Sequence, residues 1–199
     1  MNRRQVLFGA FAAPFAAGLA GCNTPVSIPV YPDITFQHKS PIRLDVRAIE
    51  VFETASTAQV EPPDRDIRYA LPISPLAAMQ SWAEDRLVAA GPAGIAQVTI
   101  AENRFVETPL DKTTGIKGLF TVDQSERYEG AMSVKLDIVG IANRSGFVEA
   151  RAAATRTVPE DYSYNQREKA LYDMVVSLSK ALDERLEQEI RAKLPAFLV

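Results

Sequence analysis

The sequence predicts an α+β domain with two layers, in which a four-stranded mixed sheet is covered on one face by two helices. Apolar and polar residues alternate over residues 131–142 and 147–158, which is the period of half-buried strands. From about residue 165 onward, apolar residues recur every three or four positions, which is the period of a helix. The expected elements follow in the order strand, helix, strand, strand, strand, helix. A right-handed crossover therefore joins the first two strands, and an antiparallel meander completes the sheet.

The first 21 residues have the layout of a secretory signal peptide. A short basic start with Arg3 and Arg4 precedes an apolar run from Val6 to about Leu19. This run contains a proline and a glycine, and it is shorter than the roughly 20 apolar residues that span a bilayer. We therefore expect residues 1–21 to be removed on export. The paired arginines also resemble a twin-arginine signal, and a basic start that suits any exporter is the alternative.

The end of this segment, LAGC, resembles the bacterial lipobox, in which a leucine and two small residues precede an obligatory cysteine. The match covers Leu19, Ala20, Gly21 and Cys22. The resemblance implies cleavage before Cys22 and acylation of its thiol, with palmitate among the chains, so that a lipoprotein faces the periplasm from its membrane anchor. Two or more acyl chains anchor stably, because each buried methylene contributes about 0.8 kcal/mol. In such lipoproteins an aspartate directly after the cysteine often means retention at the inner membrane; here that position is Asn23, which favours the outer membrane. The alternative to a lipobox is an ordinary signal peptide with an incidental cysteine.

Composition limits the partners of the mature chain. Removal of residues 1–21 takes away two of the 22 basic residues and none of the 25 acidic ones, so the remaining 178 residues carry a formal charge of −5. This balance argues against nucleic acid and against a polybasic membrane patch. The length suits one periplasmic domain over residues 42–199. Because the chain has one cysteine, that domain must be held together by packing alone.

Residues 22–41 are predicted to be a proline-rich tether between the lipid and the domain. Prolines at positions 25, 29, 32 and 41 forbid a helix and favour an extended chain of about 3.1 Å per residue. The single histidine, His38, lies in this segment. We expect it to be a solvated linker residue rather than a metal ligand or a base.

The first helix has clear boundaries in the sequence. Ser74 is the expected N-cap, Pro75 lies in the first turn, and Gly91 with Pro92 is expected to end the helix. Trp82 lies at the margin of the apolar stripe, so we expect it at the edge of the core rather than in a ligand platform. The stripe consists of Leu76, Met79, Ala83, Leu87 and Ala90.

The four expected strands differ in clarity. The first, over residues 42–52, changes phase near Ala48, which indicates a bulge. The second lies near residues 96–107, and the last two cover 131–142 and 147–158. The last strand carries a row of alanines, whose small side chains would let a bulky group pack closely against this strand. The inward-facing residues are Val98, Ile100, Met132, Val134, Leu136, Ile138, Val148, Ala150, Ala152 and Ala154.

A three-residue loop, Asn143–Ser145, is expected between the last two strands. Both inward sets occupy even positions, so the numbers of opposed residues must sum to an even number. This register pairs Ile138 with Ala150 and places Asp137 opposite Arg151 on the open face. The resulting ion pair is structural and contributes about 0.2–1 kcal/mol.

A long C-terminal helix is expected to start near Asn165, which makes a capping-box-like pair with Glu168. About thirty residues at 1.5 Å each span roughly 45 Å. A typical strand spans about 20 Å, so we expect the C-terminal half of this helix to overhang the sheet. Its apolar side consists of Leu171, Met174, Val175, Leu178, Leu182, Leu186, Ile190 and Leu194.

The connection over residues 108–130 is too long for an ordinary loop. It contains GLFTV, which fits a short extra strand, and the apolar residues Ile116, Leu119 and Phe120. Two interpretations stay open. Phe120 folds back onto the core, or these three residues form an exposed contact for a protein partner.

The inventory of chemical groups is short. His38 is assigned to the tether and Cys22 to the anchor, which removes the usual pairs of nucleophile and base. We therefore expect no enzyme, no catalytic residue, no metal ligand and no cofactor. Adjacent acids at 84–85, 160–161 and 183–184 are interpreted as solvated, since neighbours on a helix point in different directions. A carboxylate-only glycosidase or metal site is the alternative.

The order of elements, with the lipobox, the proline-rich tether and the terminal helix, resembles the auxiliary lipoproteins of ABC-type lipid transporters in Gram-negative envelopes. The segment SPLAAMQSWAEDRL is similar to their first helix, and the likeness covers most of residues 42–198. It implies a non-catalytic interaction or assembly module that docks on another envelope protein. Other envelope lipoproteins, including small activators of cell-wall synthases, share similar layouts. The alternative function is a carrier of lipid in a groove between helices and sheet, and an enzyme ranks third.

Overall fold

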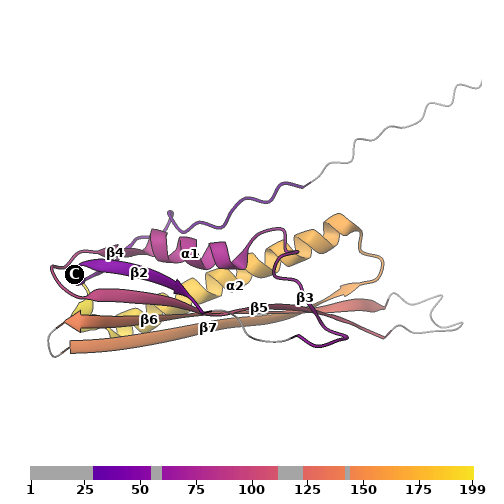
Figure 1. The fold of residues 1–199 in the computed structure, drawn as a ribbon. Coiled ribbons are helices and arrows are strands. Elements are labelled where there is room, and N and C mark those ends of the chain that lie inside the picture. Colours follow the sequence, from indigo (N-terminus) through magenta and orange to yellow (C-terminus); the bar gives the residue numbers. More distant parts are fainter. Residues whose placement is uncertain (1–28, 55–59, 112–122, 142–143) are drawn as a thin grey trace, which may run out of the picture.

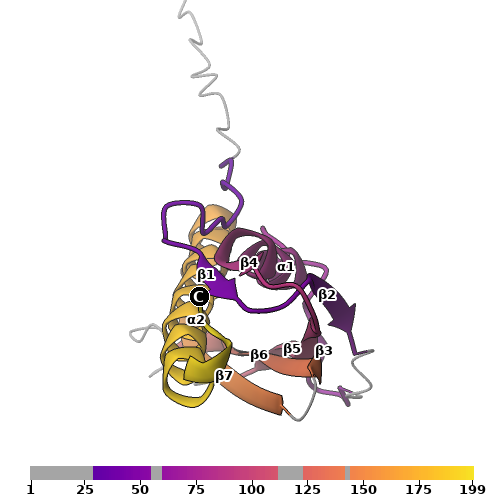
Figure 2. The ribbon, with the colours of Figure 1, turned by 90° about the vertical axis from the view of Figure 1, so that its left-hand side faces the viewer.

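The computed structural model describes residues 29–54, 60–111, 123–141 and 144–199. In this part of the chain α1 and α2 cover one face of a mixed sheet, and the opposite face is open (Figures 1 and 2). The predicted class, an α+β fold with two layers, is confirmed. The elements are β1 (Ile42–Leu44), β2 (Ala48–Glu53), β3 (Arg65–Asp66), α1 (Pro75–Arg86), β4 (Leu87–Ala89), β5 (Ile95–Pro109), β6 (Gln124–Ile141), β7 (Arg144–Pro159), α2 (Tyr164–Lys193) and a 3-10 turn (Pro195–Phe197).

The main sheet has the strand order β2-β5-β6-β7. β2 pairs with β5 in parallel, and β5, β6 and β7 pair antiparallel in succession. This arrangement is the predicted crossover followed by a meander. The sequence did not predict β3, which pairs with the far half of β5, or the small second sheet that β1 and β4 form.

The first predicted strand is two strands in two different sheets. β1 pairs with β4, whereas β2 pairs with β5. The chain turns sharply between them, and the backbone N–H of Val46 donates to the carbonyl of Leu44 at 2.8 Å. The change of phase near Ala48 therefore marks the start of β2 and not a bulge within one strand.

The helix α1 begins as predicted but ends earlier. The side chain of Ser74 accepts a hydrogen bond from the backbone N–H of Ala77 at 3.2 Å, and Pro75 opens the first turn. The helix ends at Arg86 because the next three residues are extended and pair with β1. The expected stop at Gly91 therefore follows a strand and not the helix. Trp82 lies inside the core rather than at its edge, with 1% of its surface exposed.

Gly91 lies where β4 meets the turn after β1, and Gly91→Ala is expected to destabilise the fold. A Cβ atom at this position would lie 2.5 Å from the backbone carbon of Asp45 and 2.7 Å from the backbone nitrogen of Val46. Because backbone atoms cannot turn aside as side chains do, we expect a loss of about 1–3 kcal/mol in the free energy of unfolding, measured by chemical denaturation. The exposed control Ala93→Ser is expected to change it by less than about 0.5 kcal/mol. Equally small effects of both variants would contradict this account.

The strands β5 and β6 extend well into the connection predicted over residues 108–130. β5 reaches Pro109 and β6 begins at Gln124, and Pro109 pairs with Glu126. Residues 112–122, which include all of GLFTV, lie outside the described residues. The predicted inward faces of these strands are confirmed by side chains with 0–1% exposure: Val98, Ile100, Met132, Val134, Leu136 and Ile138.

The register between β6 and β7 differs from the prediction. Ile138 pairs with Gly146, four positions short of Ala150. The pairing shifts between Ile138 and Ile141, where Gly140 has a φ of 74°. Glycine adopts this left-handed region without steric cost. Across the irregularity, the sum of the numbers of two paired residues changes from odd at Ile141 and Arg144 to even at Ile138 and Gly146. Even positions on both strands therefore still face the core, although the connection is shorter than three residues.

The predicted cross-strand ion pair is wrong for the same reason. Asp137 lies opposite Phe147 and accepts from Lys135 at 2.9 Å. Arg151 instead pairs with Glu102 of β5 at 2.6 Å. The open face nevertheless carries charged side chains, as expected.

The N-cap of α2 is not the residue that was predicted. Ser163 is the N-cap, and its backbone N–H donates to the side chain of Gln166 at 2.7 Å. In return, the backbone N–H of Gln166 donates to the hydroxyl of Ser163 at 3.4 Å. This capping box has the predicted spacing but starts two residues before Asn165.

The expected overhang of α2 is wrong. β6 has 18 residues and β7 has 16, and at about 3.4 Å per residue these strands are as long as the helix. Ile190 and Leu194 at the end of the helix are buried with 0% and 1% exposure. The core therefore runs along the whole length of α2.

The predicted alanine row lies against α2. Ala150 and Ala152 are buried, with 6% and 1% exposure. At Gly130 of β6, an added Cβ would come within 2.8 Å of Met174 and 2.9 Å of Leu178. The small residues thus allow the helix itself to approach the sheet closely.

Candidate functional site

The segment from Tyr31 to Ser40, called the strap below, lies on the helices α1 and α2 (Figure 1). Phe36 belongs to the hydrophobic core with 5% exposure, and Tyr31 and Ile34 pack against that core. The prediction that these residues belong to a tether outside the domain is therefore wrong. His38 itself is exposed, as expected for a residue without a buried role.

The strap binds the helices through apolar contacts and backbone hydrogen bonds. The ring of Tyr31 stacks on Tyr172 of α2, with centroids 4.8 Å apart and an interplanar angle of 29°. The hydroxyl of Tyr172 donates to the carbonyl of Pro32 at 3.3 Å. The backbone N–H of Phe36 donates to the carboxylate of Asp85 on α1 at 2.7 Å. Desolvation and the negative charge of Glu168 raise the pKa of Tyr31.

A buried ion pair joins α1 to α2 beneath the end of the strap. Nε of Arg86 lies 2.7 Å from Oδ1 of Asp183, and these side chains are 1% and 2% exposed. Nε1 of Trp82 donates to the same carboxylate oxygen at 3.0 Å. Trp82 and Arg86 are four residues apart, so both point from one face of α1 toward α2.

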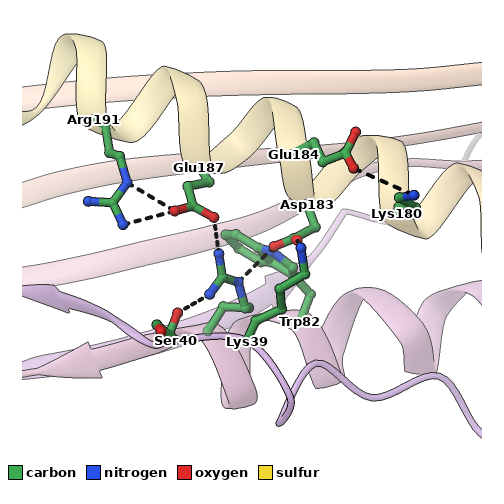
Figure 3. Close-up of polar contacts among 9 residues, drawn as sticks. Lys39, Ser40, Trp82, Lys180, Asp183, Glu184, Glu187 and Arg191 are labelled. Atoms are coloured by element: carbon green, nitrogen blue, oxygen red, sulfur yellow. Dashed lines mark hydrogen bonds and ion pairs between the residues drawn. The ribbon is translucent and has the colours of Figure 1, made fainter.

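The strap and α2 complete the partners of this pair. The guanidinium of Arg86 also donates to the carbonyl of Ser40 and to Glu187. Nζ of Lys39 lies 3.7 Å from Oδ2 of Asp183. Figure 3 shows Lys39 and Ser40 of the strap facing Asp183 and Glu187 of α2. We call Lys39, Ser40, Trp82, Arg86, Asp183 and Glu187 the strap junction.

The strap junction is suited to holding the strap rather than to proton transfer. Oδ1 of Asp183 accepts from two donors and Oδ2 faces Lys39, so the carboxylate is fully engaged. A buried carboxylate without partners would be strongly disfavoured, which makes the cluster interdependent. The interpretation of the acids at 183–184 as solvated is wrong for Asp183 and correct for Glu184, which is exposed.

A cavity of about 530 Å³ lies beside the strap junction, between the strap and α2. Ile34 and Phe36 of the strap line it, together with Tyr172 and Ser179 of α2. The hydroxyl of Ser179 is buried and has no hydrogen-bond partner in the described part of the chain. The cavity is therefore amphipathic, because both the strap and α2 contribute apolar and polar side chains to its lining.

The site residues predicted from the sequence fall elsewhere. Cys22 and the motif residues Leu19, Ala20 and Gly21 lie outside the described residues, as do Ile116, Leu119 and Phe120. Within the described ranges, no group of three or more His, Cys, Asp or Glu side chains is placed to hold a metal ion. Likewise, neither described α-helix is long and apolar enough to cross a membrane.

Comparisons with known proteins add little. No family model and no curated protein matches the chain. Among solved structures, it is similar to a minor lipoprotein from Acinetobacter baumannii, with 13% identity, 71% of this chain and 91% of that chain covered, and a TM-score of 0.36. It is also similar to the rare lipoprotein B from Shewanella oneidensis, with 7% identity, coverage of 73% and 98%, and a TM-score of 0.34. Both neighbours are bacterial lipoproteins, but likenesses this distant assign no function.

Proposed function

We propose that the protein is a non-catalytic envelope lipoprotein, anchored through acylated Cys22, that serves as an interaction or assembly module for another envelope protein. An ABC-type lipid transporter is the proposed partner, and the periplasmic face of the outer membrane is the proposed location. The strap junction is the observation that carries this proposal. Arg86 and Asp183, the buried charged residues of the described chain, hold the segment that leads back to Cys22.

The strap limits how far the domain can move from its anchor. Tyr31 lies nine positions after Cys22, and nine steps of 3.3–3.6 Å span at most about 30 Å. If the strap were free up to Ile42, twenty residues would span about 70 Å. A module that must meet a partner at one height above the membrane benefits from the shorter reach.

A lipid carrier is the second candidate, because the cavity beside the strap has the size of a ligand pocket. Buried core side chains fill the space between helices and sheet where the groove was first expected, so the strap cavity is the candidate place for a ligand. Native mass spectrometry of the purified protein tests this function. A carrier is expected to retain lipid, and a chain that retains none counts against it.

Cys22→Ser is expected to release the protein from the membrane, since the thiol is the proposed point of acylation. Fractionation of cells and the mass of the N-terminal peptide measure the effect. Asn23→Asp is the matched variant, and it is expected to keep the lipid but move the protein to the inner membrane. A Cys22→Ser protein that stays in the membrane fraction would refute the anchor.

A photocrosslinking residue at position 120 is expected to capture one specific envelope protein in cells. The matched control is position 147, because Phe147 is also a phenylalanine and is 62% exposed on β7. Immunoblotting and mass spectrometry identify the products. Capture from both positions with equal yield, or from neither, would remove the support for a partner contact at Phe120.

A further inference from the structure

The tyrosines gather around the N-terminal half of α2. Tyr164 opens this helix and is 73% exposed. Tyr69 is 94% exposed, and its neighbour Ala70 lines the same crevice of about 300 Å³ as Tyr164. All six tyrosines of the chain belong to this region: Tyr31, Tyr69, Tyr128, Tyr162, Tyr164 and Tyr172.

The chain leaves the described structure at the same place. Pro29 lies beside Asn165 and Lys169 in the first turns of α2. Val30, the next residue, is 91% exposed. Figure 1 shows the strap passing over the helices toward this end of α2 before the thin grey trace begins. Because Cys22 is only nine residues before Tyr31, the chain holds Tyr31 within about 30 Å of the anchoring membrane.

Two cationic groups beside these tyrosines are held in ion pairs. Arg68 binds Asp66 at 2.7 Å, and Lys169 binds Asp173 at 2.8 Å. The surface is therefore not a basic patch that would select anionic lipid. Tyrosine, in contrast, favours the headgroup layer of a bilayer because its ring is apolar and its hydroxyl is polar.

We propose that the surface formed by Val30, Tyr69 and Tyr164, called the tyrosine surface, rests on the headgroup layer of a zwitterionic phospholipid bilayer. This inference rests on the proposed acylation of Cys22, which brings the domain to that bilayer. The tyrosine surface then orients the domain, and the opposite end of the domain, with the C-terminus, points into the periplasm (Figure 1).

Brominated lipids test the orientation, since bromine quenches tryptophan emission only at short range. The complete lipidated protein is reconstituted in phosphatidylethanolamine vesicles with brominated acyl chains, and in matched vesicles without bromine. Tyr69→Trp and Tyr164→Trp report on the tyrosine surface, and Phe147→Trp is the control. The native Trp82 is buried and gives a constant background. We expect about twofold quenching of the added tryptophan at 69 and 164 and none at 147, with no dependence on salt concentration.

The outcomes separate this inference from the proposed function. The mass of the Cys22 peptide and sedimentation with the vesicles report the anchor. An acylated chain that sediments but shows no quenching at 69 and 164, or equal quenching at all three positions, overturns the tyrosine surface alone. Quenching that disappears in high salt overturns the neutral contact in favour of a charged one. A chain without acylation overturns the anchor and the inference together.

Discussion

Asp183→Ala is expected to lower the free energy of unfolding by about 3–5 kcal/mol, because it removes the buried carboxylate that pairs with the buried cation of Arg86. Arg86 is 1% exposed, so water cannot replace the lost carboxylate. The Nε1 donor of Trp82 loses its acceptor by the same change. Chemical denaturation of residues 22–199, with Cys22→Ser to avoid acylation, measures the loss.

The neighbouring acid provides a matched control. Glu184 follows Asp183 on α2, but its side chain is 58% exposed, and Glu184→Ala is expected to cost less than about 0.5 kcal/mol. The double variant Arg86→Met with Asp183→Leu removes both charges and is expected to recover most of the stability. A loss below about 1 kcal/mol for Asp183→Ala would show that the pair is not desolvated as described.

This pair also shows where sequence patterns stop being informative. Asp183 and Glu184 are adjacent acids on an amphipathic helix, and such pairs are usually solvated. The apolar stripe of α2 was predicted correctly, yet the stripe alone does not reveal that one acid lies inside it. The available signal was the spacing of Trp82 and Arg86, which places two donors on one face of α1. Only the crossing of the two helices reveals the acceptor.

The sheet was predicted from alternation, and its errors have local causes. The inward faces of β5 and β6 were correct because burial on one face imposes a period of two. The length of the β5–β6 hairpin was missed because glycines, prolines and charges near residues 108–130 resemble loop composition. The β6–β7 register was missed because the pairing shifts by one residue next to Gly140, a glycine with positive φ.

The strap was missed because its prolines exclude helix and central strand but do not exclude packing. An irregular segment can bury single side chains when its backbone finds partners, as Phe36 does with Asp85. No periodicity in the sequence predicts such contacts. Its status as a candidate site therefore had to come from the structure, whereas the motif at Leu19–Cys22 was visible only in the sequence.

Phe36→Ala is expected to detach the strap while the sheet and helices stay folded. The ring is 5% exposed in the core, and removal of a buried phenylalanine typically costs about 3–5 kcal/mol. Because the strap is a terminal segment, much of this loss should appear as local opening. Hydrogen exchange measures it at the amide of Lys39, which donates to the carbonyl of Phe36 at 2.8 Å. The exposed Gln37→Ala is the control and should leave exchange unchanged.

Detachment also has an expected effect in cells. Loss of the strap contacts lengthens the tether from nine to twenty residues, so the reach grows from about 30 Å to about 70 Å. The effective concentration of the domain at a partner of fixed height falls as the tether lengthens. Capture from position 120 should therefore weaken in the Phe36→Ala protein at equal abundance. If capture is unchanged while exchange at Lys39 shows the strap open, the strap serves stability alone and does not position the domain.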